Sequence, residues 1–281
     1  MELEPFLGRG GPPLSWLHPF RDARRRRLSA RPFPPEWDRI LARNFPLDAG
    51  LPAADRAELR RRVQIFLAEK HFEGAGGLVL TEEIRVTIAA QACLLLLHRG
   101  EDFYPRLDSI IVYPAAYRVR TSERSADGVV HEHDQVRLGE AWNTGAVVLS
   151  WEDVRYGAAD LHDGHNVVLH EFAHQLDLAN NAADGAPELP RRSMYVAWAR
   201  VLGHEYEHLR REIERGHRTL MDAYGATNPA EFFAVATETF FERPHALREK
   251  HPELYDQLSR FYAQDPVSWT TPSREDSCNS E

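Results

Sequence analysis

The sequence has little cysteine, no long hydrophobic run and no excess of positive charge. Its two cysteines, Cys93 and Cys278, lie in an apolar segment and a polar tail, so neither a disulfide framework nor a CxxC metal site is predicted. The most apolar stretch, residues 86–97, is bordered by Arg85 and His98 and is too short to cross a bilayer. We therefore expect no membrane span.

The charge balance and the first residues exclude further classes of protein. The 281 residues carry a net charge of −9, whereas a nucleic-acid-binding domain usually presents a basic face. No positively charged segment followed by a long apolar stretch opens the chain, so no signal peptide is predicted. We expect a cytoplasmic protein that does not bind nucleic acid.

Proline, glycine and polar residues divide the chain into three parts. Residues 1–35 are predicted to form an irregular arm rich in arginine and proline, whose basic cluster is interpreted as a solvated face. Residues 36–266 are predicted to form one unit, helical over residues 36–105 and containing strands followed by helices over residues 106–266. The polar residues 267–281 are predicted to be a disordered tail.

Hydrophobic patterning within this unit predicts an α+β fold. Short β-branched runs at residues 109–113 and 145–150 predict strands, and residues 117–120 are a weaker candidate. The polar residues 131–134 are predicted to lie in a loop. Helical periodicity follows the strands, and helices also precede them, which is typical of α+β proteins. The later helices are predicted at residues 166–178, 192–215, 229–241 and 252–262.

The strongest chemical signal is the HExxH motif at residues 170–174. On a helix, His170 and His174 project from the same face one turn apart, so both imidazoles can bind one zinc ion. Glu171 lies about a third of a turn away and can accept a proton from a metal-bound water. The flanking residues are apolar, which predicts a buried helix.

A second HExxH match, His204 to His208, provides an internal control. It contains the charged Glu207 and is followed by a highly charged stretch at residues 210–214. Its two histidines are placed at the polar flank of the predicted helix. We interpret this match as a solvated helix face.

A catalytic zinc site needs a third protein ligand, and the sequence excludes one source for it. In the extended pattern HExxHxxGxxH, a glycine and a further histidine follow the motif. Asp177 and Asn180 occupy those positions here, so this class is excluded. Asp177 is placed to support His174 from behind or to form an ordinary salt bridge.

The helix predicted at residues 229–241 offers two acidic candidates for the third ligand. Glu231 and Glu238 are two turns apart and share a face of a largely apolar helix, where an unpartnered carboxylate is costly. Glu231 also has a local explanation, because Asn228 and Pro229 make it the third residue of a capped helix. Sequence physics leaves both carboxylates open as the ligand, with the other supporting an imidazole.

Two segments closely resemble the Mlc titration factor A family of bacterial zinc peptidases. They are residues 166–177 (NVVLHEFAHQLD) and residues 222–234 (DAYGATNPAEFFA), and the similarity extends over residues 35–266. Further matches lie at residues 74–78, 88–93, 138–142 and 148–154.

The zinc-binding half is also similar to the catalytic domain of anthrax lethal factor. The two resemblances imply a zincin-like fold in which His170, His174 and Glu231 bind one Zn²⁺ per chain and Glu238 supports them. Tyr224 precedes Glu231 by seven residues, as in lethal factor, and is implied to stabilise the oxyanion or protonate the leaving group. The alternative for Tyr224 is a packed aromatic side chain.

The implied function is zinc-dependent hydrolysis of peptides, chiefly of the aminopeptidase type, with Glu171 as general base. The resemblance also implies binding to a transcriptional repressor of the Mlc type and a role in the control of sugar uptake. The alternative is a regulatory protein that sequesters such a repressor, with structural zinc or vestigial activity. Hydrolysis of a non-peptide amide is a further alternative.

Overall fold

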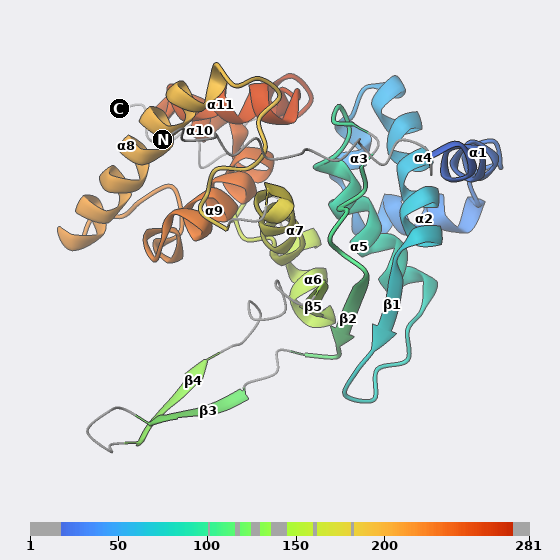
Figure 1. The fold of residues 1–281 in the computed structure, drawn as a ribbon, viewed down its shortest axis with the longest axis horizontal. Helices are drawn as coiled ribbons and strands as arrows, with labels where there is room; N and C mark the ends of the chain where they lie inside the picture. Colours follow the sequence, from blue (N-terminus) through green and yellow to red (C-terminus); the bar gives the residue numbers. More distant parts are fainter. Residues whose placement is uncertain are drawn as a thin grey trace, which may run out of the picture.

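A computed structural model describes residues 18–100, 102–115, 119–124, 130–135, 145–159, 162–180 and 183–271. Helices dominate it, and the N-terminal and C-terminal groups of helices lie on either side of α7 (Figure 1). The α-helices are α1 His18–Ser29, α2 Pro35–Asn44, α3 Leu47–Gly50, α4 Ala53–Glu69, α5 Glu82–Leu94, α6 Trp151–Ala159, α7 Val167–Asp177, α8 Met194–Glu214, α9 Pro229–Glu242, α10 Pro244–Lys250 and α11 Pro252–Tyr262. The 3-10 helices are η3 Leu178–Asn180, η4 Ala223–Ala226 and η5 Pro266–Ser268.

A small parallel sheet contains β1 His71–Gly74, β2 Ser109–Tyr113 and β5 Ala146–Ser150, in the order β1-β2-β5. Alternate residues of β2 and β5 are buried, as expected for strands with one face on the core. The predicted strands at residues 109–113 and 145–150 are confirmed. The α+β prediction holds at this level, since helices surround one small sheet.

The prediction that residues 36–105 form a helical part is incomplete at β1, which is a strand. This strand begins immediately after α4 and pairs with β2, with Phe72 opposite Ile110. The pairing partner lies almost forty residues away in the chain, so local periodicity could not reveal it. The sheet therefore joins the two parts of the predicted unit.

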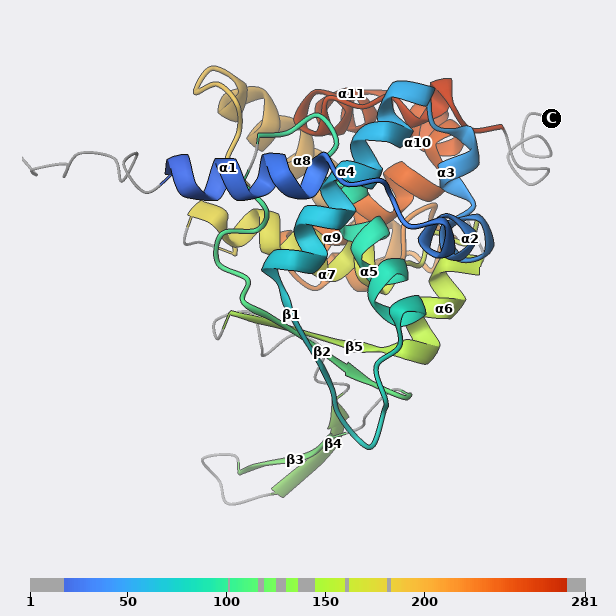
Figure 2. The same ribbon diagram turned by 90° about the vertical axis from the view of Figure 1, so that its right-hand side faces the viewer.

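An antiparallel hairpin, β3 Val119–Arg124 and β4 Val130–Gln135, separates β2 from β5 in the chain. It projects away from the helices and from the parallel sheet (Figures 1 and 2). The loop predicted at residues 131–134 is wrong, because these residues pair with residues 120–123 of β3. The residues of β4 are polar and do not alternate with apolar ones, so the sequence contained no indication of a strand there. The strand candidate at residues 117–120 is confirmed for residues 119 and 120, which lie in β3.

Both predicted irregular ends are partly ordered by long-range contacts. Residues 18–29 of the predicted arm form α1, whose Arg25 makes a buried ion pair with Glu69 of α4. In the predicted tail, Trp269 packs against the core and the Thr270 carbonyl contacts the His245 ring. These predictions are wrong for residues 18–29 and 267–271, while residues 1–17 and 272–281 lie outside the described chain.

The central position of α7 follows from its apolar face. The predicted buried side of this helix is confirmed, because Phe172 is fully buried and packs against Phe66 of α4 and Tyr104. The ring centroids lie 5.8 and 4.8 Å from that of Phe172. The opposite side of α7 faces α9. Within the described chain, no helix is long and apolar enough to cross a membrane.

Candidate metal centre

Local capping fixes where α7 begins. The Asn166 side chain accepts a hydrogen bond from the Leu169 backbone N–H at 3.0 Å, which satisfies one of the free donors at the helix start. This start places residue 170 in the second turn, with its side chain only partly buried, and His174 one turn later, fully buried. The HExxH motif thus lies on a helix, as predicted.

Local capping also fixes the start of α9. The Asn228 side chain accepts a hydrogen bond from the Glu231 N–H at 3.0 Å, and Pro229 occupies the first turn, as the sequence predicts. The loop before α8 approaches this end of α9 so closely that a Cβ atom on Gly185 would lie 2.4 Å from the Pro229 carbonyl oxygen. Gly185, with a φ of +75°, therefore keeps the end of α9 near α7.

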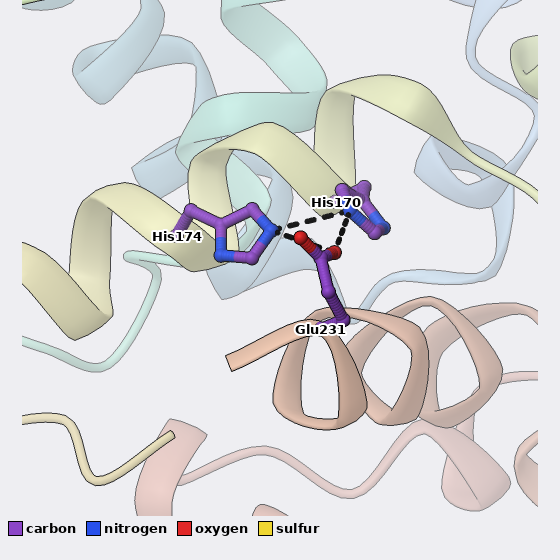
Figure 3. Close-up of side chains that lie close together, drawn as sticks. All are labelled: His170, His174 and Glu231. Carbon is purple, nitrogen blue, oxygen red and sulfur yellow. Dashed lines mark hydrogen bonds and ion pairs between the residues drawn. The ribbon is translucent and has the colours of Figure 1, made fainter. Parts of the chain in front are cut away.

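The two helices bring His170, His174 and Glu231 together. The Glu231 Oε2 atom lies 3.0 Å from His170 Nε2 and 3.2 Å from His174 Nε2, and the two Nε2 atoms are 3.2 Å apart (Figure 3). Two imidazole nitrogens and one carboxylate oxygen form the His₂Glu donor set of catalytic zinc sites. In the described part of the chain, this is the cluster whose donor atoms are close enough to share one ion.

The second glutamate of α9 contacts the other nitrogen of His170. The Glu238 Oε1 atom lies 2.7 Å from His170 Nδ1, and the Asn166 backbone N–H donates to the other carboxylate oxygen. A proton on Nδ1 leaves the Nε2 lone pair directed at the metal position. The two candidates that sequence physics left open thus occupy different positions: Glu231 lies between the imidazoles and Glu238 lies behind one of them.

Asn166 and Glu242 complete the hydrogen-bond network behind His170, and neither was predicted from the sequence. The Asn166 side-chain amide donates to Glu242 at 3.0 Å and to the Gly157 carbonyl at 3.4 Å, so the residue that caps α7 also binds α9. Glu242 is buried near the end of α9. Glu242 lies eleven residues after Glu231 and four after Glu238, so helical periodicity places all three acids on one face of an apolar helix. This spacing could have identified Glu242 from the sequence.

The electrostatics of the cluster match a site for a cation. Burial lowers the pKa of His170, but its hydrogen bonds with Glu231 and Glu238 outweigh this and raise the pKa to about 10. Burial raises the pKa of Glu231, but its hydrogen bonds with both histidines outweigh this and lower the pKa to about 2. Burial lowers the pKa of His174. Without a metal, a proton on His170 supplies the positive charge that two buried carboxylates require.

Glu171 and Tyr224 lie beside these ligands. The Tyr224 ring centroid is 6.0 Å from that of His170, and the residue is 55% exposed. Glu171 is buried, and its charge contributes to raising the pKa of both His170 and Tyr224. Burial and the nearby charges of Glu231 and Glu171 raise the pKa of Tyr224 to about 12, so the phenol keeps its proton.

Asp177 has a structural contact. Its Oδ2 atom accepts a hydrogen bond from the Gly185 N–H at 2.8 Å, and the Trp198 indole donates to the Gly185 carbonyl at 3.0 Å. Burial raises the pKa of Asp177 to about 6. Asp177 therefore links the end of α7 to the loop that contacts α9.

The second HExxH motif, on α8, forms no such cluster. His204 is exposed, as predicted for a solvated face, and Glu207 is also exposed. Glu205 departs from that prediction, because it is buried and lies 2.8 Å from the His251 ring. In this motif the buried acid contacts His251, and the His208 ring lies 6.0 Å from that same ring.

Comparisons with known proteins agree with this geometry. The model of the family described as glucose-regulated metallo-peptidase M90 matches residues 20–263. An uncharacterised protein of Synechocystis is 44% identical over 254 residues, covering 90% of this chain and 92% of the relative. Mlc titration factor A of Serratia proteamaculans is 36% identical, with 83% of this chain and 88% of the relative covered. Mlc titration factor A of Yersinia pestis is 33% identical, with 83% of this chain and 86% of the relative covered. The chain belongs to the glucose-regulated metallo-peptidase M90 family, because the family model matches nearly its whole length, and its fold assembles the candidate metal site of His170, His174 and Glu231.

Proposed function

We propose that this protein is a zinc-dependent peptidase of the gluzincin type, with a zincin-like fold. The observation that carries the proposal is the convergence of His170, His174 and Glu231 on one position, with Glu171 and Tyr224 beside it. Membership of a metallo-peptidase family supports it. His170, His174 and Glu231 would hold one Zn²⁺, which supplies a polarised, readily deprotonated water and a Lewis acid for the scissile carbonyl.

Glu171 is the general base in this proposal. It is buried at the site, and a carboxylate there accepts the proton of the attacking water and passes it to the leaving amine. It adjoins His170 in sequence but is not one of the three residues of the cluster, which suits a role in proton transfer and not in metal binding. Burial strengthens its interaction with the charges that develop during the reaction.

Tyr224 donates a hydrogen bond to the developing oxyanion or to the leaving group. Its raised pKa keeps the phenol protonated across the neutral range, which a donor requires. Its position on η4, next to the accessible side of His170, supports this role. Glu238 holds His170 in the orientation that the metal position requires.

We also propose how the substrate backbone binds. In the described sheet, β5 lies at one edge, and α6 and α7 follow it in the chain. An extended peptide can add to such an edge through main-chain hydrogen bonds. This mode suits peptides in general. The aminopeptidase assignment rests on family resemblance, and a ladder of peptides with free and acetylated N-termini tests it.

A regulatory role is the second candidate. Relatives at 33–36% identity are named Mlc titration factor A, which supports binding of a repressor of the Mlc type. The link to sugar uptake rests on the family resemblance. Because titration of a repressor occurs where the repressor acts, this candidate includes a cytoplasmic location. If binding were the whole function, zinc would be structural and Glu171 dispensable.

The deciding experiment is hydrolysis of a mixed peptide panel by the zinc-loaded protein and by Glu171→Gln. The peptidase proposal expects rates about 10²–10⁴-fold lower in the variant, with zinc content unchanged, because the amide cannot accept the proton. The matched control is Glu205→Gln in the second HExxH motif, which should leave rates within two-fold. Equal rates for Glu171→Gln and wild type, or no cleavage by either, would favour the binding role.

A further inference from the structure

The strongest charge contrast in the molecule lies on α1, which has no part in the metal centre. Residues 18–31 contain six arginines and one aspartate, whereas the whole chain has a net charge of −9. α1 packs on α4, α4 on α5 and α5 on α7, so two helices separate α1 from the metal-binding helix. It lies at the right-hand edge of the molecule in Figure 1 and on the side that faces the viewer in Figure 2.

One side of α1 is fixed to the protein. Arg25 is buried and donates from Nε and Nη2 to the Glu69 carboxylate at 2.8 and 2.6 Å. Its guanidinium also lies 4.7 Å from the centre of the Phe103 ring. Arg24 donates to the Ala68 carbonyl at 2.9 Å, and Leu28 packs against the core. The helix is thus held in a defined orientation.

The other arginines face solvent. Arg26, Arg27 and Arg31 are exposed, and in the described chain their guanidinium groups have no acidic partner. Phe20 is 86% exposed and lies seven residues before Arg27, on the same face of the helix. We call Phe20, Arg26, Arg27 and Arg31 the outer arginine face.

A shallow groove runs beside this face. It has a volume of about 700 Å³, and its lining includes the side chains of Arg21, Arg26, Ser29 and Arg61. Asp102 offsets the charge of Arg21 at 3.6 Å, while Arg26 remains without an acid. The Ser29 hydroxyl donates to the Arg25 carbonyl and Arg61 pairs with Glu58, so the groove offers the Arg26 guanidinium, in a concave setting, to a carboxylate side chain.

We propose that the outer arginine face and its groove are a docking site for an acidic segment of a protein partner. Carboxylates of the partner pair with Arg26, Arg27 and Arg31, and an apolar side chain packs on Phe20. A lipid surface fits less well, because helices that lie in a membrane interface need a broad apolar face, and that side of α1 is packed against the protein. A groove also accommodates side chains better than a planar bilayer.

The test measures binding of a labelled twelve-residue peptide of glutamate and leucine to the full-length, zinc-loaded protein by fluorescence anisotropy. Mass spectrometry of the same samples checks that the peptide is not cleaved during the measurement. The triple variant R26Q/R27Q/R31Q should weaken binding by at least about ten-fold and flatten its salt dependence. R200Q/R210Q/R211Q removes the same charge from exposed positions of α8 and should change affinity less than two-fold. Circular dichroism confirms that both variants fold.

Three outcomes overturn the proposal. Equal losses in the two triple variants would show that binding reflects net charge and not a site. Tighter binding to vesicles containing 30% phosphatidylglycerol than to the peptide, with the same dependence on Arg26, Arg27 and Arg31, would assign the face to a membrane. Wild-type protein that does not bind the peptide at low salt would also exclude the proposal.

Discussion

Helices α7 and α8 carry the same five-residue pattern and use it in opposite ways. On α7, His170 and His174 meet Glu231 of a facing helix. On α8, His204 is 71% exposed, and the acid Glu205 is buried against His251. The spacing of HExxH fixes only which residues share a helix face. What that face meets depends on how the rest of the helix packs.

The position of each motif relative to the apolar stripe explains the difference. On α7, Leu169, Phe172 and Ala173 are buried, so the histidines point away from the main core and towards α9. On α8, Glu205 lies three and four residues from the buried Leu202 and Val201, in the stripe itself. The acid of the second motif is therefore the residue that faces inward.

Removing one histidine from each motif should give the largest contrast. His174→Gln should abolish zinc binding at micromolar concentrations and reduce peptide hydrolysis by about a thousand-fold, because the site loses one of three ligands. His208→Gln should retain one zinc per chain and nearly wild-type activity. Zinc content and peptide hydrolysis are measured side by side. Loss of zinc from both variants would break the comparison.

Removing one tyrosine hydroxyl near each motif should sharpen the comparison between the two HExxH motifs. Tyr224→Phe should lower kcat by about 10²-fold with little change in KM, because the donated hydrogen bond forms in the transition state. Tyr206→Phe on α8 removes a hydroxyl that donates to the Ala226 carbonyl at 3.3 Å, and should leave kcat unchanged. A Tyr224 variant with raised KM and normal kcat would indicate substrate binding instead.

Zinc affinity should depend on pH through His170. Hydrogen bonds to two carboxylates raise its pKa to about 10 in the metal-free protein, so zinc must displace a proton at neutral pH. The apparent association constant should then rise by up to about ten-fold per pH unit between pH 6 and 8. Competition with a zinc indicator of known protonation measures it, with His251→Gln as control. A constant that is independent of pH would contradict proton displacement.

Two glutamates that each contact a histidine offer a matched pair. Glu238→Gln should weaken zinc binding by about 10–100-fold, because Glu238 orients His170 through Nδ1. Glu205→Gln breaks a similar contact to His251 without affecting zinc. Isothermal titration calorimetry with zinc separates the two. Unchanged affinity in Glu238→Gln would leave that carboxylate a purely structural role.

The smallest effect concerns stability. Glu205→Gln should lower the free energy of unfolding by about 1–3 kcal/mol, because a buried hydrogen bond to His251 is weakened. Burial raises the pKa of Glu205, but the hydrogen bond with His251 outweighs this and lowers it below its ordinary value of 4.5. The contribution is therefore present above pH 4.5 and is lost as the pH falls through the lowered pKa. Urea unfolding at pH 7 and pH 3.5 should show the difference between variant and wild type closing.

Much of the local structure around the metal centre could be predicted from the sequence. The buried face of α7 follows from helical periodicity, and the caps at Asn228 and Pro229 follow from residue types that satisfy free backbone donors. The shared face of Glu231 and Glu238 follows from their spacing of seven. Each of these features depends on neighbours within a few turns of one helix.

Other features had no local signal. The strand β1 exists because Phe72 pairs beside Ile110, and α1 is ordered because Arg25 reaches Glu69, forty-four residues away. The second role of Asn166, as a donor to Glu242, likewise joins positions seventy-six residues apart. Contacts of this kind depend on the packing of distant segments. Hydrophobic periodicity within a short stretch of sequence carries no information about such packing.

The sequence by itself determined that His170 and His174 share a helix face with Glu171 close by, because 3.6 residues per turn fix those directions. It also determined that α9 would carry two aligned carboxylates in an apolar setting. The tertiary structure alone decided that Glu205, the acid of the motif on α8, is buried against His251. It also decided that Glu231 lies between the imidazoles while Glu238 lies behind His170, because only the packing of α9 against α7 sets which atoms meet.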